Sequence, residues 1–290
     1  MEIINGKKIA KEIKSDLAKE VEQLKRLGVN PALTVILVGN DSASEIYVRS
    51  KAKACAEIGI SSNILRLSKK IEQKELINLI SRINQDAKIH GLLVQLPLPD
   101  HLDEDVVVQS VALEKDVDCF CAENVGRMFF GKGEILSCTP AGVVELLRRS
   151  GVGIAGKDVV IIGRSRVVGR PLAAMLINLN ATVTVCHKQT KNLSEKCAQA
   201  DILISAAGQA GLVIEEMIKP GAVVIDVGIN RTKEGKVVGD VVWSAAERRA
   251  SLATPVPRGV GPMTIAMLLK NTIIAANIAA KKLNKKQVTK

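Results

Sequence analysis

The sequence predicts an α/β protein of two domains with a cleft between them. Two observations support this prediction. Short apolar segments alternate with amphipathic helical segments along the chain, which is typical of parallel βα units. The 290 residues are 47% apolar but only 2% aromatic, so Val, Ile, Leu and Ala must build the core. Such a core suits parallel strands that are buried on both faces.

The first part of the chain begins with an amphipathic helix over residues 9–27 and an apolar strand over 33–38. The spacing of Ser42 and Glu45 matches a capping box, so the next helix is expected to begin at Ser42 and to end near Gly59. A strand near 63–67, a helix near 72–86 and a strand over 91–96 follow.

The pattern restarts near Thr139, which can cap a helix that has Pro140 at its first position and runs to about residue 150. Strands are expected at 158–162, 182–186, 202–205 and 222–226. We therefore predict a first domain over 1–139 and a second over 140–270, with the C-terminal helix, 271–290, packing back on the first. A cleft enclosed by two domains is a preferred place for ligands.

Charge and composition argue against several classes of protein. The net charge of +11 is spread over the body and a lysine-rich tail, without the clustered aromatic residues of many nucleic-acid binders. No apolar signal segment opens the chain, and polar residues interrupt the apolar stretch 263–280, so we expect a cytoplasmic protein without a membrane span. The cysteines are scattered, so we expect reduced thiols and no metal site.

The turn after the strand 158–162 resembles a dinucleotide-binding turn. It reads Gly163-Arg164-Ser165-Arg166-Val167-Val168-Gly169, with Ser165 where the second glycine of a Rossmann motif would stand. The next strand ends in Cys186-His187-Lys188, without the carboxylate that holds the ribose of NAD. Cations at Arg164, Arg166 and Lys188 favour NADP instead. The alternative is a set of exposed basic side chains without a ligand.

A candidate catalytic face lies on the helix that begins near Ser42. Ser44, Tyr47 and Lys51 are spaced at i, i+3 and i+7, which places a hydroxyl, a phenol and an amine on one side. The alternative is a solvated helix face along which the lysine stem lies.

Together these residues resemble the bifunctional methylenetetrahydrofolate dehydrogenase/methenyltetrahydrofolate cyclohydrolase family over essentially the whole chain. The segments that carry the resemblance are residues 47–51 (YVRSK), 94–99 (VQLPLP), 115–118 (KDVD), 163–165 (GRS), 226–230 (DVGIN) and 254–264 (TPVPRGVGPMT).

The resemblance implies a homodimer with a folate-binding first domain and a Rossmann-like, NADP-binding second domain. It assigns catalytic roles to four residues that would also contact the folate, Lys51, Tyr47, Gln95 and Asp118, of which Asp118 would bind the pterin. It also implies residues that would border the folate, namely Val94, Leu96, Pro257, Gly259, Gly261, Pro262 and Thr264. The residues that it implies beside the cofactor are Gly163, Arg164, Ser165 and Ile229. By its charge, Lys188 would also contact the cofactor.

The implied chemistry suits these residue types. Hydride transfer from the methylene bridge needs orientation more than a base. Hydrolysis of the cationic methenyl bridge needs a proton to be moved, for which Lys51, positioned by Gln95, is suited. Tyr47 offers a flat face to the folate, and Asp118 can accept hydrogen bonds from the pterin. The positive charge suits a polyglutamylated tetrahydrofolate.

The sequence departs from the family pattern at Cys119 and Arg258, where glycine is usual, and at Cys121, Ser137 and Lys188. Two alternatives stay open at this point. A short-chain dehydrogenase also uses Tyr-x-x-x-Lys, but there the nucleotide turn precedes the pair, whereas here Tyr47 precedes Gly163. The other alternative is a basic NADP- or RNA-binding module without catalysis, for which a steep salt dependence of binding would favour nucleic acid.

Overall fold

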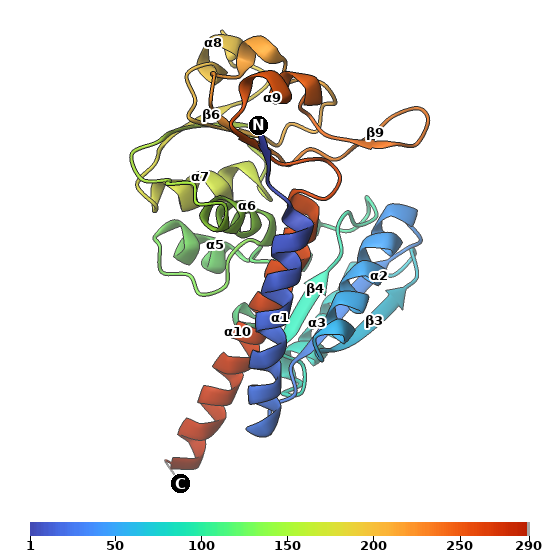
Figure 1. Cartoon of the computed structure of the whole chain (residues 1–290). Coiled ribbons are helices and arrows are strands. Elements are labelled where there is room, and N and C mark those ends of the chain that lie inside the picture. Colours follow the sequence, from blue (N-terminus) through green and yellow to red (C-terminus); the bar gives the residue numbers. More distant parts are fainter. Residues whose placement is uncertain (289–290) are drawn as a thin grey trace. The chain divides into compact units, whose positions relative to one another are not determined.

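The computed structural model describes residues 1–288, with side chains described for all of these except 42, 43 and 282–288 (Figure 1). The chain divides into two compact units. Unit 1 comprises Met1–Lys11, Met128–Lys132 and Ser137–Met267, and unit 2 comprises Glu12–Arg127, Gly133–Leu136 and Leu268–Lys290. The expected C-terminal segment 271–290 includes residues 289 and 290, which lie outside the described part of the chain.

Unit 1 contains a parallel sheet of six strands in the order β1-β11-β8-β7-β5-β6. Because all strands run in the same direction, their carboxyl ends meet at one edge of the sheet, which is where α/β proteins bind ligands. The strands are β1 (Glu2–Ile3), β5 (Asp158–Ile162), β6 (Thr182–Cys186), β7 (Ile202–Ser205), β8 (Val223–Asp226) and β11 (Leu252–Ala253).

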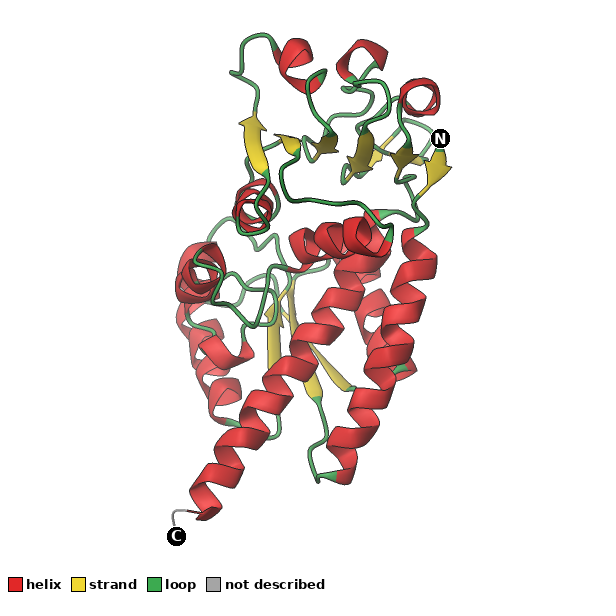
Figure 2. Ribbon diagram, turned by 60° about the vertical axis from the view of Figure 1, so that its left-hand side comes forward, coloured by secondary structure: helices red, strands yellow, loops and turns green. Residues whose placement is uncertain are grey.

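Helices lie on both faces of this sheet (Figure 2). Val160 and Ile162 of β5, Leu203 of β7 and Val224 of β8 form a buried cluster with residues of α8, α9 and a 3₁₀ turn. A small antiparallel hairpin of β9 and β10 extends the unit. Its elements are α6 (Cys138–Arg149), α7 (Gly169–Ile177), α8 (Leu193–Cys197), η2 (Glu215–Met217), β9 (Asn230–Arg231), β10 (Val237–Val238) and α9 (Trp243–Arg249).

Unit 2 contains a parallel sheet in the order β3-β2-β4. Alternate residues of β2 and β4, among them Ile36 and Val94, pack against the apolar side of α3. The strands are β2 (Ala32–Val38), β3 (Ser61–Leu67) and β4 (Gly91–Val94), and the helices are α1 (Gly6–Arg26), α2 (Ser42–Glu57), α3 (Gln73–Gln85), α4 (Glu104–Gln109), η1 (Leu113–Lys115), α5 (Ala122–Phe129) and α10 (Val260–Val288). Three divisions between the units fall within α1, α5 and α10, and two more, at 132/133 and 136/137, fall in the loop between α5 and α6.

Helix α10 is long and apolar enough, by length and composition, to cross a bilayer over Val260–Lys281. However, 56% of the apolar window is buried inside the protein, as is usual for a core helix of a folded domain.

Two predicted helix caps are wrong. The cap of α2 is Asp41, whose carboxylate accepts a hydrogen bond from the Ser44 N–H at 2.7 Å, and Ser42 already belongs to the helix. Asp is as good a cap as Ser. Asp41, one residue before Ser42, forms the capping bond instead. Likewise Thr139 lies inside α6, which begins at Cys138, and its hydroxyl hydrogen-bonds to that of Thr264 at 3.0 Å.

Candidate functional site

In unit 2, the structure joins two of the predicted catalytic residues directly. The Lys51 Nζ on α2 donates a hydrogen bond of 3.0 Å to the Gln95 Oε1, in the residue that follows β4. The Gln95 Nε2 donates in turn to the carbonyl of Leu96 at 2.7 Å, which fixes the amide so that its oxygen faces the lysine. The residue pair therefore has a defined geometry.

Helix α2 gives its polar side chains different degrees of burial. Ser44 is buried, Lys51 is 9% exposed and Tyr47 is 44% exposed. A lysine stem buried to this degree, with its amine bonded to a neutral amide, is not a freely solvated side chain. The solvated-face alternative therefore does not describe Lys51. Tyr47 keeps a ring surface available for a flat ligand.

Asp118 lies in a loop that a neighbouring carboxylate organises. The Asp116 side chain accepts hydrogen bonds from the N–H groups of Phe120 and Cys121 and from the Asn124 Nδ2, at 2.9–3.0 Å. Burial raises the pKa of Asp116, and these three hydrogen bonds oppose the shift. Asp116 also forms a parallel bridge with Leu92 of β4. The loop is thereby attached to the strand that leads to Gln95.

A buried asparagine of α10 supports the same loop. The Asn271 Nδ2 donates to the carbonyl of Val117 at 2.8 Å and to that of Leu136 at 2.7 Å. All of these residues belong to unit 2. The sequence signal for this role was present, because Asn271 is one of the polar residues that interrupt the apolar stretch of α10.

In unit 1, the turn after β5 has the close packing of a dinucleotide-binding turn. Gly163 has φ of 122°, and a Cβ there would lie 2.3 Å from the Ala206 carbonyl oxygen. A Cβ on Gly169, which opens α7, would lie 2.0 Å from the Gly163 oxygen. Ser165 occupies the position of the second glycine because its hydroxyl accepts a hydrogen bond from the Val168 N–H at 3.1 Å, which closes the turn.

The side chains around this turn suit an anionic dinucleotide. Arg164 and Ser165 are exposed in the turn, Lys188 is exposed just after β6, and Ile229 is exposed after β8. No carboxylate occurs in the segment 186–190 that follows β6. The turn, the N-terminus of α7 and these cations therefore fit a dinucleotide with a phosphate on its ribose.

The loop before α10 is also in unit 1 and is tightly packed. A Cβ on Gly259 would lie 2.5 Å from the Pro255 oxygen. Its neighbour Arg258 is exposed and has φ of 88°, a conformation that favours glycine. The predicted folate-contacting residues of this loop, Pro257, Gly259, Gly261, Pro262 and Thr264, thus belong to unit 1, whereas Lys51, Tyr47, Gln95 and Asp118 belong to unit 2.

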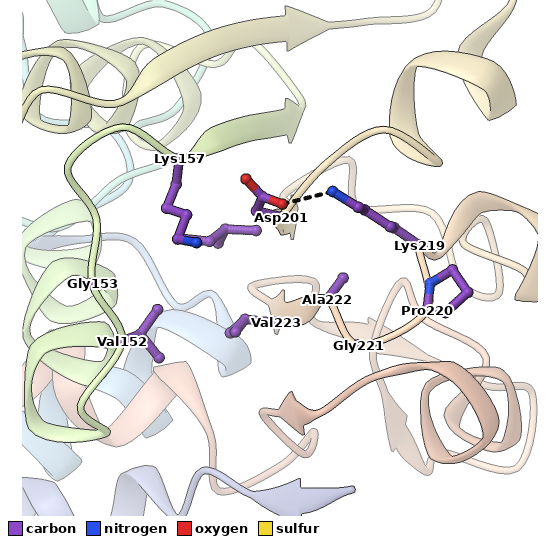
Figure 3. Close-up of a pocket in the computed structure, with 10 residues that line it drawn as sticks. Val152, Gly153, Lys157, Asp201, Lys219, Pro220, Gly221, Ala222 and Val223 are labelled. Carbon is purple, nitrogen blue, oxygen red and sulfur yellow. Dashed lines mark hydrogen bonds and ion pairs between the residues drawn. The ribbon is translucent and has the colours of Figure 1, made fainter.

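A cavity of about 160 Å³ lies at the amino ends of β5, β7 and β8 (Figure 3). Lys157 and Lys219 line it, and Lys219 forms an ion pair of 2.7 Å with Asp201. This is the edge of the sheet opposite the Gly163 turn. None of the predicted site residues lines the cavity.

No cluster of potential metal ligands occurs among the described residues. The fold, the Gly163 turn of unit 1 and the Lys51–Gln95 pair of unit 2 together define a class of protein. It is an α/β dehydrogenase whose Rossmann-like unit carries a phosphate-binding turn and whose other unit carries a lysine–glutamine pair.

The family models place the chain within that class. The NAD(P)-binding domain of tetrahydrofolate dehydrogenase/cyclohydrolase matches residues 137–280, and the catalytic domain of the same family matches residues 4–118. The chain belongs to the tetrahydrofolate dehydrogenase/cyclohydrolase family, and it is an enzyme with both activities. This membership removes the alternatives of a short-chain dehydrogenase and of a binding module without catalysis.

Individual relatives agree with the family models over nearly the full length. The bifunctional protein FolD of Acetivibrio thermocellus is 54% identical over 279 residues, which cover 96% of this chain and 98% of the relative. The crystal structure of the bifunctional FolD enzyme from Campylobacter jejuni is 49% identical, with a TM-score of 0.95 over 96% of this chain and 99% of that one. The FolD structure from Trypanosoma brucei, a complex with NADP and an inhibitor, is 41% identical, with a TM-score of 0.90 over 95% of this chain and 97% of that one.

The sequence did not reveal the residues that position the loops of the site without facing a ligand. Asp116, Asn124 and Asn271 position the Asp118 loop in unit 2. Asp240 positions the loop after β7 in unit 1. Asp116 was visible within the KDVD motif. The role of Asp240 has no local sequence signal, because its partners lie 10–35 residues away.

Proposed function

We propose that the enzyme oxidises 5,10-methylenetetrahydrofolate to 5,10-methenyltetrahydrofolate with NADP, and then hydrolyses the product to 10-formyltetrahydrofolate, with Lys51, Tyr47, Gln95 and Asp118 at the folate. The hydrogen bond of 3.0 Å between Lys51 and Gln95 is the observation that carries this assignment. It places an amine, which can carry a proton, in a fixed position on a largely buried stem.

Each residue has a distinct task in this proposal. In the hydrolysis, the oxygen of water bonds to the methenyl carbon, the bond from that carbon to N5 breaks, N5 gains one proton and a second proton is released. An ammonium carries three N–H donors, so the bond from Lys51 to Gln95 leaves donors for water and substrate. The Asp118 carboxylate accepts hydrogen bonds from the pterin, and Tyr47 packs on the flat part of the folate.

The cofactor is held by the turn of unit 1. The N-terminus of α7 and the backbone of the Gly163 turn bind the pyrophosphate, and Arg164 and Lys188 bind the 2′-phosphate. NADP held there would supply the hydride acceptor for the oxidation of the methylene bridge. Ile229, which is exposed beside the carboxyl end of β8, borders the cofactor.

We propose further that the enzyme is a cytoplasmic homodimer and that its substrate carries a polyglutamate tail. The net charge of +11 supports the last point, because carboxylates of the tail are attracted to a basic protein. Light scattering of the purified protein tests the homodimer, and KM values for mono- and polyglutamylated substrate test the tail.

An absorbance assay tests the function. Methylenetetrahydrofolate is supplied with NADP or with NAD, and the reduced cofactor and the methenyl intermediate are followed together. We expect reduced NADP to form while the methenyl signal stays low, because hydrolysis follows oxidation. Reduced cofactor together with a methenyl signal that decays no faster than in buffer would exclude the hydrolase activity. Absence of reduced cofactor with either dinucleotide would exclude the dehydrogenase.

A further inference from the structure

Asp240 has more hydrogen-bond partners than any ligand-facing residue predicted from the sequence. Its side chain is completely buried. The Oδ1 atom accepts from the Gln209 N–H at 2.9 Å and from the Asn230 Nδ2 at 2.9 Å. The Oδ2 atom accepts from the Ser205 hydroxyl at 2.9 Å and from the N–H groups of Ala207 at 2.8 Å and Gly208 at 3.2 Å. Each of these bonds has Asp240 as the acceptor, which suits an ionised carboxylate.

These bonds fix the loop that follows β7. Ser205 ends β7, and Ala207, Gly208 and Gln209 continue from it along the carboxyl edge of the sheet. The same loop lies directly against the cofactor turn. The Ala206 N–H donates to the Ile162 carbonyl at 2.7 Å, and the Ala206 carbonyl oxygen occupies the space where a Cβ of Gly163 would be.

Asp240 also fixes the segment that carries Ile229. Asn230, the next residue, donates to Asp240, and on the other side a Cβ on Gly228 would lie 2.2 Å from the Asp240 Oδ1. Asp240 thus holds the residue on one side of Ile229 by a hydrogen bond, and Gly228, on the other side, packs closely on the same carboxylate and donates its own N–H to the Asp226 Oδ1 at 2.9 Å. A second buried carboxylate, Asp226, accepts from the Asp240 N–H at 3.0 Å and positions the backbone of Asp240 itself.

We propose that Asp240 is a positioning residue for the dinucleotide site: it holds the loop 205–209 against the Gly163 turn and holds Ile229 at the carboxyl edge of the sheet. This inference rests on the proposed function of that turn as the NADP site. Asp240 does not contact the cofactor in this proposal. It acts through the loop 205–209, which packs against the Gly163 turn, and through Asn230, the neighbour of Ile229.

The test compares Asp240→Asn with a matched variant, Asp201→Asn. Asn keeps the size of the side chain but replaces one acceptor oxygen by an amide N–H, which faces N–H donors of the loop. Asp201 is in the same unit and also accepts a backbone N–H, from Asp158 at 3.1 Å, but it lies at the opposite edge of the sheet (Figure 3). Calorimetry gives Kd for NADP, and steady-state assays give KM for NADP and the rate of methenyl hydrolysis, which needs no cofactor.

For Asp240→Asn we expect Kd and KM for NADP to rise about tenfold or more, the effect of losing hydrogen bonds to a charged group. Methenyl hydrolysis should keep its wild-type kcat and KM, and Asp201→Asn should keep the wild-type Kd for NADP. A merely structural role would lower both activities together. A wild-type Kd for NADP in Asp240→Asn, or an equal loss of both activities, would overturn the proposal.

A milder variant keeps the test decisive if Asp240→Asn does not fold. Ser205→Ala removes one donor and leaves the carboxylate with its other partners. It should raise Kd for NADP several-fold, and an unchanged value would again overturn the proposal. Failure of the proposed function has a different outcome: the wild-type protein itself would then not bind NADP or reduce it.

Discussion

The side chain of Asn271, in the C-terminal helix α10, donates a hydrogen bond of 2.8 Å to the carbonyl of Val117, the residue before Asp118. The two residues are 154 positions apart in the chain. A single buried amide therefore connects the last helix to the loop that we assign to the pterin. The same amide group also donates to the Leu136 carbonyl at 2.7 Å, so replacing the asparagine by an apolar residue removes both of these hydrogen bonds.

We expect Asn271→Leu to lower the free energy of unfolding by about 2 kcal/mol, since it removes two hydrogen bonds that each contribute about 1 kcal/mol. It should also raise KM for methylenetetrahydrofolate through displacement of Asp118. Asn277→Leu, on the same helix and in the same unit, is the matched control and should change neither value. Urea unfolding and steady-state kinetics measure both. Equal effects of the two substitutions would refute the role of Asn271.

Lys51→Met should slow methenyl hydrolysis by about 10²-fold or more, the usual contribution of proton transfer by a positioned side chain. Hydride transfer should be kept to within about tenfold, because it needs orientation more than a base. Lys53→Met is the control, since Lys53 is exposed on the same helix. Both activities are assayed separately, with the methenyl compound supplied directly for the second. If Lys51→Met hydrolyses it at the wild-type rate, Lys51 has no catalytic role.

Replacing Arg164 and Lys188 together by Ser should reduce the ratio of kcat/KM for NADP to that for NAD by about tenfold or more, because hydrogen bonds between charged groups contribute about 1–3 kcal/mol. The double variant Lys157→Ser/Lys219→Ser removes the same charge from the cavity at the other edge of the sheet (Figure 3). It should leave the ratio unchanged. An unchanged ratio in the first variant would place the 2′-phosphate elsewhere.

Arg258→Gly has two expected effects. Relief of the left-handed conformation, φ 88°, should stabilise unit 1 by about 1 kcal/mol. If the exposed guanidinium contacts an anionic ligand, KM for NADP or for the folate should rise while kcat stays nearly constant, as for lost uniform binding. Arg258→Asn separates the two effects, because Asn tolerates this conformation but carries no charge. The ligand contact is ruled out if neither KM changes in either variant.

Burial raises the pKa of Asp226 from 3.8 to about 6, although three backbone N–H groups stabilise its charge. Between pH 4 and 6 the folded state therefore binds more protons than the unfolded state, so this group lowers the free energy of unfolding as pH rises. The loss, measured relative to Asp226→Asn, should reach up to about 3 kcal/mol by pH 7. Denaturant unfolding at pH 4.5 and 7 measures it. A rise in relative stability over the same interval would contradict the prediction.

The central strands could be predicted from the sequence because their apolar runs are long enough to be read locally. Strands β5, β6 and β7 occupy the expected residues, and β2 and β8 differ by one. The caps of α2 and α6 were wrong by one or two residues, because several neighbouring residues could each serve as a cap. Two-residue strands such as β1 and β11 have no periodicity to detect, and they form only because the rest of the sheet offers an edge.

The ligand-facing residues could be predicted from local sequence, whereas the residues that hold them in place could not. Lys51 and Gln95 were selected from short motifs, and the structure brings them within hydrogen-bond distance. Asp240 and Asn271 act on backbone groups that are distant in the chain, so their partners depend on the complete fold. Asn271 stood out in the sequence as a polar residue within an apolar stretch, but its partners did not, and Asp240 had no local signal at all.

The pairing of β1 with β11 affects the order in which unit 1 can form during synthesis. Glu2 is the first residue of its strand to leave the ribosome, yet its partner in the sheet is Leu252. Because a strand pair needs both of its strands, this edge of the sheet can form only after β11 has been made. The residues of β1 therefore have no partner in this sheet until β11, which follows β5 to β8 in the chain, has been made.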